Sequence, residues 1–72
     1  MDFSQRLCSI MEKNNISAYR LSKDTGISDR LIGYWKDNER SPTKGNIIKL
    51  ADYFDVSTDY LLGRTDNPKM NK

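Results

Sequence analysis

The sequence ISAYRLSKDTGISDRLIGYWKDN, residues 16–38, contains two short amphipathic helix patterns, one on either side of Gly26. Each half begins with an aliphatic residue, then a serine, and then a second aliphatic residue five positions after the first. The two sets are Ile16, Ser17 and Leu21, and Ile27, Ser28 and Ile32. A serine at this place caps the free N–H groups of a helix start, and the flanking aliphatic side chains pack across the cap. The stretch therefore predicts two helices joined by a tight turn, which is a helix-turn-helix.

Helical patterns also flank this stretch. Before it, apolar residues recur at helical spacing, and Asp2 with Gln5 forms a capping box, which predicts a helix that ends near residue 13. Within the stretch we expect helices over residues 18–24 and 29–36. After a polar loop, Thr43 caps a helix that runs to about residue 54, and Ser57 caps a short helix that ends near residue 62. The predicted core is Leu7, Ile10, Leu21, Ile27, Ile32, Trp35, Ile47, Leu50, Ala51, Phe54, Val56 and Leu61.

These patterns predict an all-α fold in which five helices share one small core. We expect one domain over residues 1–63, with the helix-turn-helix at about residues 17–37, followed by a flexible tail over residues 64–72. The tail, RTDNPKMNK, lacks periodicity and contains a proline. Gly63 is expected to end the last helix.

Several functional classes have little support in the composition. The chain has 72 residues, no apolar run long enough to span a bilayer and no hydrophobic leader, so we expect a cytoplasmic protein. Cys8 is the single cysteine and there is no histidine, so no metal site is expected. No nucleophile and base are paired and no phosphate loop is visible, so neither an enzyme nor a bound cofactor is expected.

The charge is distributed unevenly along the chain. The net charge is only +2, but residues 17–46 carry six basic and four acidic residues, whereas residues 47–63 carry one lysine and three aspartates. The helix-turn-helix segment is thus the basic part of the folded region, which favours a nucleic-acid partner, although a difference this small also fits ordinary surface variation.

An ordered set of residues carries a family resemblance over about residues 6–63. The set is Leu21, Gly26, Ile27, Ser28, Ile32 and Trp35, then Ser41-Pro42-Thr43, then Ile47 with Leu50-Ala51, and the ending FDVSTDYLLG at residues 54–63. The chain in this respect resembles the Cro/cI-type (XRE-like) helix-turn-helix repressors of bacteria and phages. The resemblance implies a compact five-helix, lambda-repressor-like domain that binds double-stranded DNA.

The chain departs from the usual pattern of that family at several positions. Ala18 stands where the family often has a glutamine that meets a phosphate or assists a base contact, so one polar contact is missing. Ser22 and Thr25 replace a usual alanine and leucine, and we expect slightly looser packing between the two helices. Asn38 stands where glycine is common and is expected to adopt the left-handed conformation.

In a helix-turn-helix, the second helix lies in the major groove and its exposed face reads the bases. The base-reading residues that we expect are Asp29, Arg30, Gly33 and Tyr34. Arg30 can bond bidentately to guanine, and its position in the motif favours this role over that of a solvated arginine. Asp29 can accept a hydrogen bond from cytosine or simply stabilise the helix dipole. Gly33 would let the helix approach DNA closely, and Tyr34 would contact a thymine methyl group or a phosphate, or pack on the surface.

Phosphate contacts are expected around the groove, from helix starts, loops and basic side chains. The residues are Ser17, Ala18, Tyr19, Ser28, Lys36, Asn38, Arg40, Thr43 and Lys44. Ala18 would contribute through its main-chain N–H, and a solvated surface charge is the alternative interpretation of Lys36.

The function predicted from the sequence is sequence-specific binding to double-stranded DNA by a transcriptional regulator. The expected form is a repressor that binds an inverted-repeat operator as a homodimer, in the cytoplasm and on the nucleoid when bound. The alternative is an antitoxin-like or adaptor module that uses the same fold to bind a protein, with the acidic residues Asp52, Asp55 and Asp59 facing a basic partner.

Overall fold

The computed structural model describes residues 2–69 and contains five helices within that range. They are α1 (Phe3–Lys13), α2 (Ala18–Thr25), α3 (Asp29–Lys36), α4 (Lys44–Phe54) and α5 (Thr58–Leu61). Each of the five lies where the sequence predicts a helix, with ends that differ by one residue at most. The described residues form no strand.

Local capping contacts explain most of these helix starts. The capping box of Asp2 and Gln5 forms at the start of α1, and the hydroxyls of Ser17, Thr43 and Ser57 each accept a hydrogen bond from a backbone N–H in the first turn of the next helix. Ser28 is the N-cap residue of α3, as predicted, but its side chain makes no capping hydrogen bond. Its ψ is 134°, against 154° to 178° at the other four caps.

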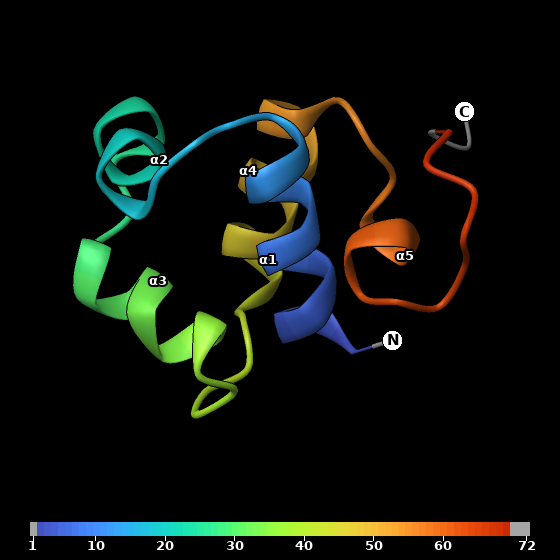
Figure 1. Ribbon diagram of the computed structural model, residues 1–72. Helices are drawn as coiled ribbons and strands as arrows, with labels where there is room; N and C mark the ends of the chain where they lie inside the picture. Colours follow the sequence, from blue (N-terminus) through green and yellow to red (C-terminus); the bar gives the residue numbers. More distant parts are fainter. Residues whose placement is uncertain (1, 70–72) are drawn as a thin grey trace.

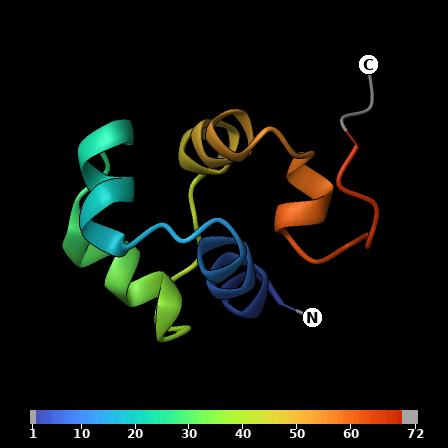
Figure 2. The same ribbon diagram turned by 45° about the horizontal axis from the view of Figure 1, so that its top comes forward.

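The two halves of the helix-turn-helix lie on one side of the molecule, and α5 lies on the other, in both views (Figures 1 and 2). Between them stand α1 and α4. Contacts join α1 to α3 and α5, α2 to α3 and α4, and α4 to α5. The helix-turn-helix therefore packs against α1 through α3 and against α4 through α2.

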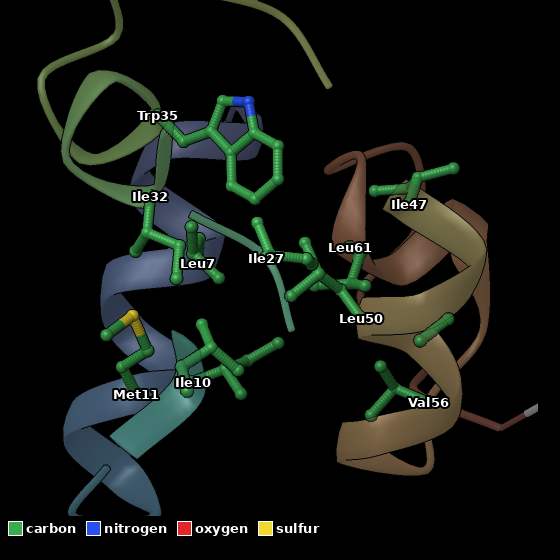
Figure 3. Packing of buried hydrophobic residues seen from close by; sticks show 12 residues of the cluster. Leu7, Ile10, Met11, Ile27, Ile32, Trp35, Ile47, Leu50, Val56 and Leu61 are labelled. Carbon is green, nitrogen blue, oxygen red and sulfur yellow. The ribbon is translucent and has the colours of Figure 1, made fainter. Parts of the chain in front are cut away.

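The core is a single apolar cluster to which all five helices contribute (Figure 3). Trp35, Leu7, Leu21, Ile32, Leu50 and Leu61 are its largest fully buried side chains. Eleven of the twelve predicted core residues are buried, and the exception is Phe54. Phe54 is the last residue of α4 and is only partly buried, with its ring 5.0 Å from that of Tyr53 in an edge-on arrangement. Met11, which the prediction left out of the core, is 4% exposed.

The carboxy-terminal segment, residues 64–69, lies against α1 and α5. Arg6, with a side chain only 8% exposed, donates hydrogen bonds to the backbone oxygen of Thr65 at 3.2 Å and to the carboxylate of Asp66 at 3.0 Å. Its guanidinium also stacks on Tyr60, 4.0 Å from the ring centroid. The backbone N–H of Ser57 donates to the oxygen of Pro68 at 2.9 Å. The sequence did not predict these contacts, and the mobility of the tail stays a prediction.

Candidate nucleic-acid interface

The turn between α2 and α3 is held by hydroxyl groups as well as by its glycine. Gly26 adopts the left-handed conformation, with φ of 78°. Ser22 donates to the carbonyl of Ile27 at 2.6 Å, and Thr25 donates to the carbonyl of Leu21 at 2.7 Å. The Thr25 hydroxyl also accepts a hydrogen bond from the Ile27 N–H at 3.2 Å, so both polar residues that depart from the family pattern tie Ile27 of the turn to α2.

The exposed face of α3 follows from which of its residues enter the core. Ile32 and Trp35 are fully buried, so at 3.6 residues per turn the opposite side of the helix carries Arg30, Gly33 and Tyr34. Arg30 is exposed, whereas Gly33 and Tyr34 are partly buried. Asp29 lies exposed in the first turn, at the edge of this face. The four predicted base-reading residues therefore share one helix and are accessible to different degrees.

The predicted phosphate contacts come from three separate elements. Ser17, Ala18 and Tyr19 lie at the start of α2, where Tyr19 is 70% exposed. Ser28 is exposed, and its hydroxyl is free of the capping bond. The remaining residues are exposed at the end of α3, in the loop after it, or at the start of α4: Lys36, Asn38, Arg40, Thr43 and Lys44.

The loop after α3 folds back onto that helix. Asn38 has a φ of 59°, which confirms the predicted left-handed conformation, and the backbone N–H of Glu39 donates to the carbonyl of Tyr34 at 2.8 Å. The guanidinium of Arg40 lies 4.7 Å from the ring centroid of Tyr34, in a cation–π contact. From the opposite side, Ser4 of α1 donates to the carbonyl of Lys36 at 2.8 Å and fixes the end of α3.

A polar contact that the sequence did not predict joins α2 to α4. The Asp24 carboxylate oxygen Oδ2 accepts a hydrogen bond from the Tyr53 hydroxyl at 2.6 Å and another from Nε of Arg20 at 2.8 Å. These two bonds lower the pKa of the Asp24 carboxyl, and they raise the pKa of the Tyr53 hydroxyl and of the Arg20 guanidinium. The spacing of Arg20 and Asp24 by four residues is a sequence signal for half of this network. Nothing local points to Tyr53.

Neither a metal-binding cluster nor a membrane-spanning helix is found within the part of the chain that the structure describes. No three His, Cys, Asp or Glu side chains among residues 2–69 gather so that they could hold a metal ion. Over the same residues, no helix is both long enough and apolar enough to cross a membrane.

Comparisons with known proteins point to one family. A family model described as helix-turn-helix matches residues 9–61. The chain is 30% identical over 66 residues to YobD, described as an uncharacterized HTH-type transcriptional regulator of Bacillus subtilis, and the match covers 92% of this chain and 59% of YobD. It is 26% identical over 72 residues to the HTH-type transcriptional regulator ImmR of the same organism, covering 100% of this chain and 57% of ImmR.

A solved structure shares the fold. The crystal structure of a transcriptional regulator from Listeria innocua superposes with a TM-score of 0.79 at 24% identity, over 86% of this chain and 58% of that one. This likeness confirms the predicted all-helical, helix-turn-helix fold. The chain spans less than two thirds of the length of each of these three proteins.

Proposed function

The chain belongs to the XRE-like, Cro/cI-type helix-turn-helix family, and from this membership we propose that it binds double-stranded DNA sequence-specifically and represses transcription. The family consists of transcriptional regulators and not of enzymes, in agreement with the prediction from the sequence. The observation that carries the proposal is the exposed face of α3, which presents Arg30 on a helix held in place by its buried Ile32 and Trp35. In the proposal, residues 1–63 are the DNA-binding unit.

In this proposal, α3 enters the major groove with its amino-terminal end nearest the bases. Arg30 bonds to guanine, and Asp29 beside it accepts a hydrogen bond from cytosine. Gly33, one turn further along, allows the backbone of α3 to come close to the groove. Support comes from the open space around Gly33, where a methyl group would meet no heavy atom within 4 Å.

The phosphate contacts position α3 on the duplex without reading its sequence. We assign them to Ser17, Ala18, Tyr19, Ser28, Lys36, Asn38, Arg40, Thr43 and Lys44. The start of α2 supplies backbone N–H groups, and the loop and the start of α4 supply Arg40 and Lys44. Arg40→Ala or Lys44→Ala should weaken binding to every duplex and lower the number of released counterions by about one per bound chain.

The repressor role and the oligomeric state are the finer parts of the proposal. A single α3 reads few base pairs, so two copies on an inverted repeat, with their recognition helices about 34 Å apart, supply the affinity that a regulator needs. A homodimer placed on an operator excludes RNA polymerase from the overlapping DNA. This function places the protein in the bacterial cytoplasm, on the nucleoid when it is bound.

The test begins with selection of binding sites from random-sequence duplex DNA by the full chain. We expect a palindromic consensus and two chains per duplex. Arg30→Ala should relax the preference at one base pair of each half-site by about 1–3 kcal/mol. Arg64→Ala is the matched control, because it removes the same charge from an exposed arginine beyond α5, and it should leave the preference unchanged.

One outcome would overturn the proposal, and a second would overturn only its oligomeric part. A folded chain that selects no consensus would refute sequence-specific binding and leave the antitoxin-like or adaptor module, with Asp52, Asp55 and Asp59 as its docking residues. A consensus without symmetry, bound by one chain, would refute the dimer alone.

A further inference from the structure

Tyr34 and Arg40 are in contact, although the sequence predicts different roles for them: base reading for Tyr34 and phosphate binding for Arg40. Tyr34 lies on the base-reading face of α3, and Arg40 lies in the loop that follows. The guanidinium carbon of Arg40 is 4.7 Å from the centroid of the Tyr34 ring, well within the reach of a cation–π interaction. Tyr34 is partly buried and Arg40 is exposed. The ring is therefore the more fixed partner.

The backbone brings the two residues together before the side chains meet. Residues 37–39 each donate a backbone hydrogen bond to the last turn of α3, at 3.0, 3.1 and 2.8 Å. Asn38 reverses the chain with its left-handed conformation. Residue 40 then starts beside residue 34. The loop backbone thus brings Arg40 close to the Tyr34 ring, and the contact with the ring then restricts the long Arg40 side chain.

A stacked guanidinium keeps its N–H donors available. A guanidinium that lies over a ring with its flat face leaves its five N–H groups pointing outward in the plane, and the guanidinium carbon of Arg40 lies over the Tyr34 ring. Among residues 2–69, Arg40 enters no salt bridge that would occupy those donors. A guanidinium held in one plane with its donors free is the arrangement that binds a phosphate bidentately.

We propose that Tyr34 acts on DNA as a positioning residue, by holding Arg40 in the orientation that grips a backbone phosphate, and not by reading a base. The proposal rests on the proposed function. The ring face that carries Arg40 is not available to a thymine methyl group. The energetic effect of Tyr34 is therefore independent of DNA sequence and passes through Arg40.

The test measures binding of the full chain to two duplexes, one of mixed sequence and one carrying the selected consensus, across a salt series. Tyr34→Leu removes the aromatic face but keeps an apolar side chain on a helix, and Tyr34→Phe keeps the face but removes the hydroxyl. We expect Tyr34→Leu to weaken binding to both duplexes by the same factor, about two- to fivefold. Tyr34→Phe should bind both duplexes as the wild type does. In the Tyr34→Leu background, Arg40→Ala should cost less than it does in the wild type.

The outcomes separate this inference from the function on which it rests. If the wild-type chain binds neither duplex, the proposed function fails. If the wild type binds and Tyr34→Leu weakens binding only to the consensus, Tyr34 reads a base and the inference is wrong. Equal losses from Tyr34→Phe and Tyr34→Leu would assign the effect to the hydroxyl and overturn it too. Thermal melting of each variant checks folding, and Tyr34→Met, which also lacks the ring, replaces Tyr34→Leu in the same comparison if that variant does not fold.

Discussion

Gly33 is the residue of α3 whose substitution separates folding from DNA binding most cleanly. Glycine inside a helix costs about 1 kcal/mol relative to alanine, because the unfolded chain gives up more backbone freedom. Gly33 lies in the middle of α3, and its φ is not among the positive glycine values. A methyl group there would meet no heavy atom within 4 Å other than its chain neighbours and the backbone of α3 itself. Gly33→Ala should therefore stabilise the fold by about 1 kcal/mol, which raises the melting temperature by roughly 4–8 °C in a domain of this size.

The same methyl group would stand on the face of α3 that we place in the major groove. If the backbone there approaches DNA closely, the added group displaces the helix and lengthens the contact of Arg30 with guanine. The loss of binding free energy should approach the contribution of the Arg30–guanine contact, about 1–3 kcal/mol. This corresponds to at least a fivefold fall in affinity for the consensus duplex. Gly33→Ala should thus be more stable and bind less tightly.

The assays are thermal unfolding followed by circular dichroism, and fluorescence anisotropy with a labelled consensus duplex. Ser9→Ala is the control, because Ser9 is exposed on α1 and alanine is the better helix former by a few tenths of a kcal/mol. It should raise stability slightly and leave DNA binding unchanged. A lower melting temperature for Gly33→Ala would refute the argument from open space and helix propensity. A higher melting temperature with unchanged affinity would refute the close approach to DNA.

Three further predictions concern the fold that carries this face. Leu50 is fully buried, so Leu50→Ala should destabilise the chain by about 2–5 kcal/mol in urea unfolding, and a loss below 1 kcal/mol would show that the core closes around the gap. The folded-state pKa of Asp24 is lowered, so its stabilising contribution is complete above the unfolded pKa of about 3.9 and is lost as the pH falls through the folded value. The melting temperature of the wild type should therefore exceed that of Asp24→Asn at pH 7, and the difference should shrink below about pH 4; a constant difference would contradict this linkage. Asp66→Ala removes the carboxylate partner of the buried Arg6, so amide hydrogen exchange at Ser57, which bonds to the carboxy-terminal segment, should become faster while the melting curve stays cooperative. An unchanged exchange rate would show that this segment is held without the ion pair.

The sequence predicts which residues form the base-reading part of the candidate site, because these residues all lie on one helix. Asp29, Arg30, Gly33 and Tyr34 share a face because two apolar residues of α3 must enter the core, and helical periodicity gives that face directly. Their exposure was less predictable. Tyr34 is partly covered because the loop after α3 turns back over it, and no periodic pattern describes that loop.

What the sequence by itself determined is the set of helices and their ends. Ser17, Thr43 and Ser57 start helices, and Gly26 and Asn38 adopt left-handed conformations, because each of these preferences arises between residues at most a few positions apart. Such local preferences act in the same way whatever the rest of the chain does.

Only the tertiary structure decided which distant side chains meet. The hydrogen bond of Tyr53 to Asp24 joins residues 29 positions apart, and the ion pair of Arg6 with Asp66 joins residues 60 apart. The tertiary structure also determines that Met11 is buried while Phe54 stays partly exposed. These outcomes depend on how five amphipathic helices pack around one small core, since each helix specifies its apolar side but not the neighbour that covers it.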